Sequence, residues 1–257
     1  MISILLATYN WPQALKLCLE SLATQTDLDF EIIIADDGST QSTTQLIDSY
    51  KDILPITHLW QEDEGFRKTK ILNQAIATAQ GDYLIFLDGD CIVQPDFVER
   101  HRQLAQKGYL VTGSRVLLNE KLTQDLLSWK TWDFTQFRSQ LLSNRLNGQI
   151  NKLLPILVKL GNGSWRDYKK FVWRRIKGCN MACWKADAQA IGGFDETMTG
   201  WGHEDADFVF RLQRHHIKRK SGSWSTEVFH LFHPIHDQSN AEENARRVRE
   251  KILAKAM

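Results

Sequence analysis

The 257-residue sequence has little of what marks a membrane-spanning, secreted or fibrous protein. It contains no run of about 18 apolar residues, so we expect no transmembrane helix. The chain opens on the apolar run ISILLA with no basic segment before it, which favours a strand over a signal peptide. The four cysteines, Cys18, Cys91, Cys179 and Cys183, are too few for a disulfide scaffold. We therefore expect reduced thiols in a cytoplasmic protein.

A charge excess of either sign is also missing. The 32 Lys and Arg against 31 Asp and Glu leave a net charge of +1, so we expect no nucleic acid or other polyanion as a partner of the whole chain. What is present is the composition of an ordinary globular protein, 42% hydrophobic and 25% charged. The length is enough for one large domain with a real core.

The first 115 residues alternate between short apolar runs and segments with helical spacing. Strands are predicted at 2–8, 31–35, 56–60, 83–87 and 109–113, and helices at 12–24, 42–50, 68–79 and 95–107. Gly81 is predicted to end the third helix as its left-handed C′ residue. Strands separated by such helices predict βαβ units, hence an α/β fold with a mainly parallel central sheet flanked by helices. Ligands of such sheets bind beyond the carboxyl ends of the strands.

The segment 120–175 differs in composition from the rest. It holds 11 Lys and Arg against 4 Asp and Glu, a net +7, with tryptophans and phenylalanines interleaved. Two interpretations stay open. One is a surface that rests on an anionic membrane and helps to bind a substrate, namely the acceptor if the chain is a transferase. The other is a helical insertion whose aromatic residues pack inward. After it, the sequence predicts a globular stretch at 178–191, a turn at Gly192-Gly193 and a last polar helix at about 240–256.

Two carboxylates, Asp88 and Asp90, follow the apolar run YLIFL with one glycine between them. Other Asp-x-Asp pairs occur at 27–29 and 205–207, so spacing alone says little. Position at a strand end distinguishes the first pair, because a ligand site belongs there. We expect it to hold a divalent cation that leaves coordination sites for diphosphate oxygens.

Polar residues also follow the first and second predicted strands. Asp37 lies in the sequence Asp-Asp-Gly-Ser after the second, where it could accept the N3–H of a uracil or simply form a turn. Thr8, Tyr9 and Asn10 follow the first strand. Together with Asp88 they would line one crevice if the three strands are neighbours. Arg67 and Lys70 open the helix before the Asp88 strand and are candidates to meet a diphosphate.

Later motifs add acid, base and imidazole groups. In Gly-Trp-Gly-His-Glu-Asp-Ala-Asp, Glu204 and Asp205 are either helix-start carboxylates or a general base facing an acceptor hydroxyl, with Trp201 as a sugar platform. Three histidines, His230, His233 and His236, occur within seven residues, and at least one is expected to bind a metal such as manganese.

Cys179 and Cys183 are spaced four residues apart. We interpret these two thiols as buried small residues, because no second pair accompanies them.

Taken together, ATYN at 7–10, ADDGS at 35–39, DGD at 88–90 and GWGHEDAD at 200–207 resemble a GT-A fold glycosyltransferase of family 2. The C-terminal part is similar to the galactosyltransferase-type region of β-1,4-galactosyltransferases, polypeptide N-acetylgalactosaminyltransferases and chondroitin polymerases. The resemblance covers about 1–115 and 178–236.

The resemblance implies one GT-A domain over 1–257. Its parts would be a Rossmann-like nucleotide-sugar half at 1–115, a basic aromatic insertion at 116–177, and an acceptor-side half with a C-terminal helix at 178–257.

The resemblance also implies roles for individual residues. Asp90 resembles the metal ligand for Mn²⁺ or Mg²⁺, joined by His233 and His230, and Asp205 resembles the catalytic base, with Glu204 positioning a sugar. On the donor side, nucleotide contacts are implied for a further set: Thr8, Tyr9, Asn10, Asp37, Arg67, Lys70 and Asp88. Trp201 and Gly202 would meet the acceptor.

The implied reaction is transfer of a sugar from a nucleotide-sugar to a glycan or lipid-linked acceptor with inversion, and a UDP-linked donor is expected. A bacterial surface polysaccharide or lipopolysaccharide is the expected product. No Gln-x-x-Arg-Trp motif is present, which argues against a processive membrane-embedded synthase. Alternatives are a sugar-phosphate nucleotidyltransferase, disfavoured by the lack of a glycine-rich loop after the first strand, and a non-catalytic carbohydrate-binding protein.

Overall fold

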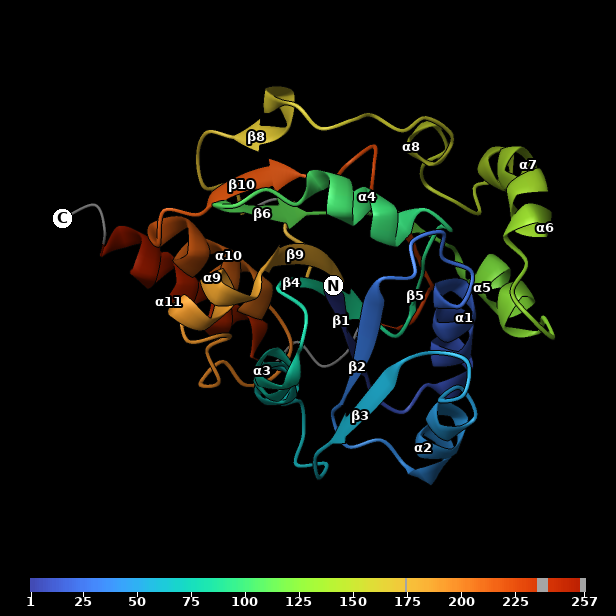
Figure 1. The fold of residues 1–257 in the computed structure, drawn as a ribbon, viewed down its shortest axis with the longest axis horizontal. Coiled ribbons are helices and arrows are strands. Elements are labelled where there is room, and N and C mark those ends of the chain that lie inside the picture. Colours follow the sequence, from blue (N-terminus) through green and yellow to red (C-terminus); the bar gives the residue numbers. More distant parts are fainter. Residues whose placement is uncertain (174, 235–239, 255–257) are drawn as a thin grey trace.

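The computed structural model of this chain describes residues 1–173, 175–234 and 240–254. These residues form an eight-stranded sheet in the order β3-β2-β1-β4-β9-β6-β10-β8, with helices on both faces (Figure 1). A smaller sheet has the order β5-β11-β7. None of the described helices is both long and apolar enough to cross a bilayer.

Strands and helices alternate through the first half of the chain, and the bounds of all strands and α-helices follow here. The strands are β1 Ile2–Thr8, β2 Phe30–Asp36, β3 Ile56–Trp60, β4 Tyr83–Asp88, β5 Cys91–Ile92, β6 Tyr109–Thr112, β7 Ser114–Leu117, β8 Asp167–Tyr168, β9 Asn180–Trp184, β10 Lys218–Ser221 and β11 Glu227–His230. The helices are α1 Pro12–Leu22, α2 Gln41–Asp48, α3 Lys68–Thr78, α4 Phe97–Leu104, α5 Glu120–Leu127, α6 Phe134–Ser139, α7 Leu141–Leu146, α8 Leu154–Leu157, α9 Lys185–Ala190, α10 Glu204–Arg214 and α11 Ala241–Leu253.

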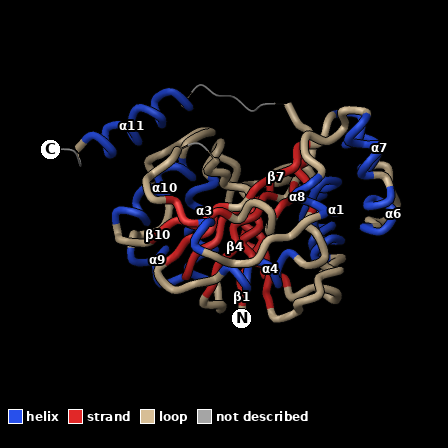
Figure 2. The backbone as a smooth tube through the Cα atoms, turned by 90° about the horizontal axis from the view of Figure 1, so that it is seen from above, coloured by secondary structure: helices blue, strands red, loops and turns tan. Residues whose placement is uncertain are grey.

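The central strands are buried on both faces, as expected for parallel strands covered by helices. Side chains of β1 alternate between two cores: Ile4 and Leu6 pack with α1 and α4, whereas Leu5 and Ala7 pack with α3 and α10. Seen from above, α9, α10 and α3 lie to one side of the strands and α1, α6 and α7 to the other (Figure 2). The predicted α/β fold with a mainly parallel sheet is confirmed.

One strand departs from the simple βαβ order. β9 lies between β4 and β6 and is antiparallel to both, so β6 does not pair with β4. The sequence prediction placed no strand at 180–184. The stretch Asn-Met-Ala-Cys-Trp fits there because Met181 and Cys183 face one core and Ala182 the other.

The end of α3 also differs from the prediction. The helix ends at Thr78, Ala79 caps it with extended backbone, and Gly81 does not have a positive φ. Instead, a Cβ at Gly81 would lie 2.7 Å from the carbonyl oxygen of Met1 and from Ser3 Oγ. The glycine is therefore required by close approach to β1, not by a left-handed cap. Gly192 and Gly193, by contrast, adopt φ of +74° and +72°, as the predicted turn requires.

Most aromatic residues of 120–175 pack inward. Trp132 and Phe137 are buried in a third core, where Phe137 contacts Phe229 at 4.8 Å between ring centroids. One of the positive charges of the segment is buried as well. Arg166 donates hydrogen bonds to four backbone carbonyls, those of Leu160, Gly161, Ser221 and Ser223. Arg166 is therefore a cation of this segment that packs inside the protein.

Candidate active site

The carboxyl ends of β1, β2 and β4 meet at one edge of the sheet. Thr8 is in register with Asp36, and Ala7 with Asp88. The polar residues that follow these three strands are therefore brought together, as the sequence analysis expected. Gly89 N donates to Ala7 O at 2.7 Å, which fixes the turn after β4 against β1.

The two aspartates after β2 have different surroundings. Asp36 is fully buried, accepts a hydrogen bond from Ser39 N at 2.8 Å and pairs with His58 Nε2 at 3.0 Å, so it holds the turn together. Asp37 accepts hydrogen bonds from Arg67 N and from the Gln61 side chain. Burial raises the pKa of Asp37 despite these donors.

The segment after β1 is tied to the same turn. Asn10 adopts φ +47°, its N–H donates to Ser39 Oγ, and its side-chain carbonyl accepts from Thr40 N at 2.8 Å. Tyr9 is 48% exposed and donates from its hydroxyl to Asp63 at 2.8 Å. Asn10 therefore shapes the loop, while the ring of Tyr9 is accessible to a ligand.

The cation at the end of β4 is Lys68. Its Nζ lies 2.5 Å from Asp88 Oδ1. Burial would lower the pKa of Lys68, but the charges of Asp88 and Glu204 raise it above its usual range. Lys70 points into solvent, and Arg67 is held by Glu64 and the carbonyl of Glu62.

The structure thus brings Lys68, which the sequence analysis did not select, to the place expected for Arg67 or Lys70. The helical spacing of the sequence could have identified Lys68. Lys68 lies three and four residues before Ile71 and Leu72, both buried, and so shares the inward face of α3.

Asp90 meets two imidazoles. Its Oδ2 lies 3.3 Å from His233 Nε2 and 3.6 Å from His230 Nε2, and these three side chains offer donor atoms within 4.8 Å of one another. Burial would raise the pKa of Asp90, but the hydrogen bond with His233 and the charges of both histidines lower it to about 2. The hydrogen bond to Asp90 raises the pKa of His233, whereas burial lowers that of His230. His236, the third candidate, lies outside the described residues.

The residues Glu204 and Asp205 begin α10. Asp205 is oriented by two backbone donors, Gly178 N at 2.8 Å to Oδ2 and Ala206 N at 2.7 Å to Oδ1. Burial and the charge of Asp205 raise the pKa of Glu204 to about 7, against the lowering effect of Lys68. Two adjacent carboxylates thus differ in surroundings: Asp205 is held by the backbone, and Glu204 exchanges protons near neutrality.

The loop before α10 depends on its glycines. Gly200 and Gly202 adopt φ of +73° and +112°, and a Cβ at Gly200 would lie 2.5 Å from Asn240 Nδ2. Asn244 on α11 donates to the carbonyls of Thr199 and Gly202. The indole of Trp201, between the glycines, is left partly exposed. This loop therefore presents Trp201 on a backbone held by α11.

The last acid of the motif, Asp207, has a structural position. It is fully buried and binds Arg211 Nε at 2.7 Å and Lys251 Nζ at 2.6 Å, so it joins α10 to α11. This explains the Asp205-x-Asp207 spacing without a metal.

These groups form one connected site. The charge of Glu204 acts on Lys68, which binds Asp88. On the other side, Asp90 is followed by Cys91, whose thiol lies close to that of Cys179. The chain next to Cys179 supplies the backbone donor that orients Asp205. Such an arrangement has a cation, candidate metal ligands and two carboxylates at one sheet edge.

Comparisons with known proteins agree with this arrangement. Residues 3–164 match the family model described as glycosyl transferase family 2, and residues 166–234 match the model described as N-terminal domain of galactosyltransferase. The two models together include the site residues from Thr8 to His233, while α11 lies beyond the matched residues.

Several characterised sequences are similar over most of the chain. Validoxylamine A glucosyltransferase of Streptomyces hygroscopicus subsp. jinggangensis is 29% identical over 238 residues, which is 90% of this chain and 56% of that protein. Chondroitin synthase of Escherichia coli is 28% identical over 221 residues, 83% of this chain and 32% of that protein. The chain therefore spans little more than half of the one relative and a third of the other.

Solved structures share the fold at low sequence identity. S. aureus TarS superposes with a TM-score of 0.66 at 17% identity and covers 98% of this chain, which matches 39% of TarS. The mannosyltransferase PcManGT from Pyrobaculum calidifontis, in complex with GDP-Man and Mn²⁺, has a TM-score of 0.64 at 14% identity, with 98% of this chain and 64% of that one covered. The expected GT-A fold is confirmed, and the chain belongs to glycosyl transferase family 2.

Proposed function

We propose that the chain transfers a sugar from a UDP-linked donor to a hydroxyl of a glycan or lipid-linked acceptor, with inversion and with a divalent ion at Asp90. The observation that carries the proposal is the convergence of Lys68, Asp90 and Asp205 at the carboxyl edge of a nucleotide-binding type of sheet. Relatives named chondroitin synthase support a polysaccharide or a related surface glycan as the product.

The donor would lie along the ends of β1 and β2. Asp37, buried at the turn, offers a carboxylate oxygen to a base N–H, and Tyr9 an exposed ring beside it. A uracil N3–H suits such an acceptor, and a structure of TarS with UDP supports this nucleotide. Lys68 and the Asp88 carboxylate would then meet the ribose and diphosphate. The role of Arg67 would be to carry the backbone N–H that positions Asp37.

The donor atoms around Asp90 fit a divalent ion. One carboxylate and two imidazoles, from His230 and His233, are ligands that Mn²⁺ accepts, and two nitrogen ligands favour it over Mg²⁺. Held by these three residues, a divalent ion would supply positive charge to offset that of a departing diphosphate.

The chemistry of the chain's own residues centres on Asp205. Its carboxylate takes the proton of the acceptor hydroxyl while the hydroxyl oxygen forms a bond to the anomeric carbon, and the bond to the diphosphate breaks with its electron pair leaving on that group. Attack and departure on opposite faces give inversion. Trp201 stacks on the acceptor sugar, the Gly202 backbone leaves room for it, and Glu204 positions a sugar hydroxyl.

The test compares binding with turnover. In Asp205→Asn, we expect UDP to bind as in the unaltered chain, while transfer from the UDP-sugar falls by roughly 10²–10⁴-fold, the usual contribution of a general base. Unchanged turnover would remove Asp205 from the proposed role. A non-catalytic sugar-binding protein would show no turnover in either form, and a nucleotidyltransferase would release diphosphate from a nucleoside triphosphate and a sugar phosphate.

We also propose that the surface formed by α7 and α8 faces a membrane, because it exposes leucines beside cations. Leucines on α7 and α8 are exposed, with Leu146 at 78% and Leu154 at 60% of their surface. A hollow of about 400 Å³ beside them is lined by Leu154 together with Arg145, Lys152 and Trp224. Exposed leucines beside cations are typical of proteins that rest on anionic lipid.

Flotation with vesicles tests this surface. We expect the chain to float with vesicles of phosphatidylserine and phosphatidylcholine but not with phosphatidylcholine alone, and the Leu146→Ser/Leu154→Ser variant to lose flotation. Leu28→Ser is the matched control, because Leu28 is 74% exposed elsewhere on the surface. Equal flotation of both variants would contradict this part of the proposal.

A further inference from the structure

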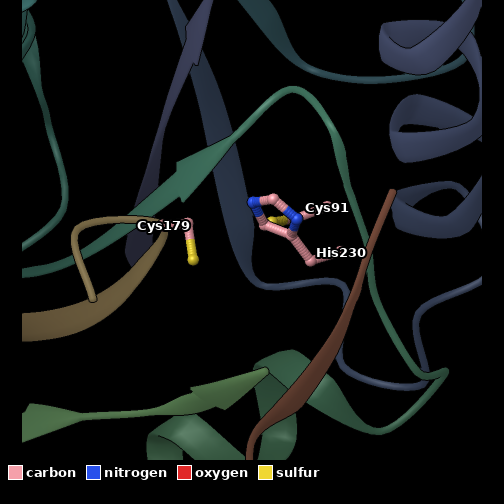
Figure 3. A group of neighbouring side chains, drawn as sticks. All are labelled: Cys91, Cys179 and His230. Carbon is pink, nitrogen blue, oxygen red and sulfur yellow. The ribbon is translucent and has the colours of Figure 1, made fainter. Parts of the chain in front are cut away.

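A second set of possible metal ligands lies behind the Asp90 site. The thiols of Cys91 and Cys179 and the imidazole of His230 offer donor atoms that all lie within 4.8 Å of one another. Figure 3 shows the ring of His230 beside Cys91, with Cys179 approaching from the segment just before β9. His230 belongs to both sets, the outer one with Asp90 and His233 and the inner one with the two cysteines.

Three separate segments hold the inner set in place. Cys91 on β5 is directly paired with His230 on β11 in an antiparallel ladder. Cys179 immediately precedes β9, which pairs along β4. Both cysteines are buried, and neither forms a disulfide. Backbone pairing therefore fixes the spacing of the three donors without any metal, which lowers the entropy cost of binding one.

The two sets differ in chemical preference. The outer set consists of one carboxylate and two imidazoles, and ions such as Mn²⁺ accept these ligands. Two thiolates and an imidazole select thiophilic ions, Zn²⁺ above all, which bind four ligands tetrahedrally. Asp90 Oδ1 lies 3.5 Å from Cys91 Sγ but groups with the outer set, so the fourth position of an ion held by the inner set would be left to water.

We propose that Cys91, Cys179 and His230 form a Zn²⁺ site that excludes the ion of the outer site. On binding, each thiol transfers its proton to solvent and forms one Zn–S bond, so two protons are released per ion and no oxidant is needed. Because His230 is shared, one site can be filled only at the expense of the other. The inhibitory consequence rests on the proposed function, whereas the binding of zinc does not.

Binding is tested first, on reduced, nucleotide-free protein. Titration with Cd²⁺, a spectroscopic substitute for Zn²⁺, should give one equivalent of ultraviolet sulfur-to-metal charge-transfer absorption, and competition with a chromophoric chelator should give the Zn²⁺ affinity. We expect Cys91→Ala and Cys179→Ala each to weaken Zn²⁺ binding roughly 100-fold or more. Cys183→Ala is the matched control, since Cys183 is equally buried but lies in the other core. Thermal unfolding of each variant verifies that it folds.

His233→Ala separates the two sets, because His233 belongs only to the outer one. Zn²⁺ affinity should be unchanged in this variant. A loss in His233→Ala with no loss in the cysteine variants would place zinc at the outer site and overturn the proposal, as would the absence of charge-transfer absorption in the unaltered chain.

Nucleotide binding measures whether Zn²⁺ inhibits the outer site. Equimolar Zn²⁺ should abolish Mn²⁺-dependent UDP binding to the unaltered chain but not to Cys179→Ala, whose outer ligands are intact. Equal inhibition of both would contradict mutual exclusion. If no UDP binds at all, the proposed function fails, while the cadmium absorption still decides the zinc site.

Discussion

Lys68 Nζ lies 2.5 Å from Asp88 Oδ1 and is the cation that the fold brings to the donor side of the site. Asp88 and the candidate diphosphate would both be anionic there, so the partly buried Lys68 would offset their charge. This pairing makes Lys68 a better candidate for the nucleotide than the exposed Lys70 or the loop-bound Arg67.

The first prediction concerns that lysine. Lys68→Met should weaken UDP binding by roughly 10–100-fold, the value of a charge-assisted hydrogen bond of about 1.5–3 kcal/mol. Titration calorimetry with Mn²⁺ present measures it. Lys70→Met is the control and should stay within about twofold of the unaltered chain, because an exposed lysine makes little net contribution. Equal losses in the two variants would contradict the assignment.

The second prediction is a pH dependence of stability that arises from Glu204. Its pKa is about 7 in the folded chain and 4.5 in a model peptide, so the folded state holds the proton more tightly. Stability from this group is therefore present below pH 4.5 and is lost as the pH rises through about 7. Glu204→Gln should raise the free energy of unfolding at pH 8 by about 1–2 kcal/mol, after allowance for solvent screening, and should not raise it at pH 4.

Denaturant unfolding at both pH values measures this effect. Glu242→Gln is the control, since Glu242 is an exposed carboxylate on α11. A gain of the same size at both pH values would mean that the charge of Glu204 is not its cause.

The third prediction concerns the link between α10 and α11. Lys251→Ala should destabilise the chain by about 1.5–3 kcal/mol, the value of a hydrogen bond to a charged group, because it removes one of the two cations bound to the buried Asp207 carboxylate while Arg211 stays in place. Arg249→Ala, an exposed position on the same helix, should cost less than about 0.5 kcal/mol. Urea unfolding measures the stability of both variants. Equal losses in Lys251→Ala and Arg249→Ala would mean that the ion pair of Lys251 contributes no more than an exposed one.

Much of the site follows from sequence because parallel strands place their carboxyl ends together. The strands that end at Thr8, Asp36 and Asp88 each contain an apolar run, so their meeting at one edge of a parallel sheet could be expected, but their order along that edge could not. The division of roles between Asp36 and Asp37 could not be predicted, because both are buried and only the contact with His58 on β3 shows which carboxylate holds the turn.

Other features depend on contacts between distant segments. Strand β9 is short, and nothing within its five residues says that it inserts between β4 and β6. Cys179 shows the same limit, since its partner Cys91 is 88 positions earlier in the sequence and only the fold brings the two thiols together. The interpretation of Cys179 as a buried small residue is correct for its burial but leaves out this neighbour.

The measurement that tests the account most directly is calorimetric titration of UDP into the chain with and without Mn²⁺, repeated with Asp90→Ala. The account predicts micromolar binding that requires Mn²⁺ and disappears in the variant, because Asp90 is the carboxylate shared by both histidines. Binding of equal strength without the ion and in the variant, or no binding of UDP under any of these conditions, would contradict a metal-dependent UDP site at this edge of the sheet.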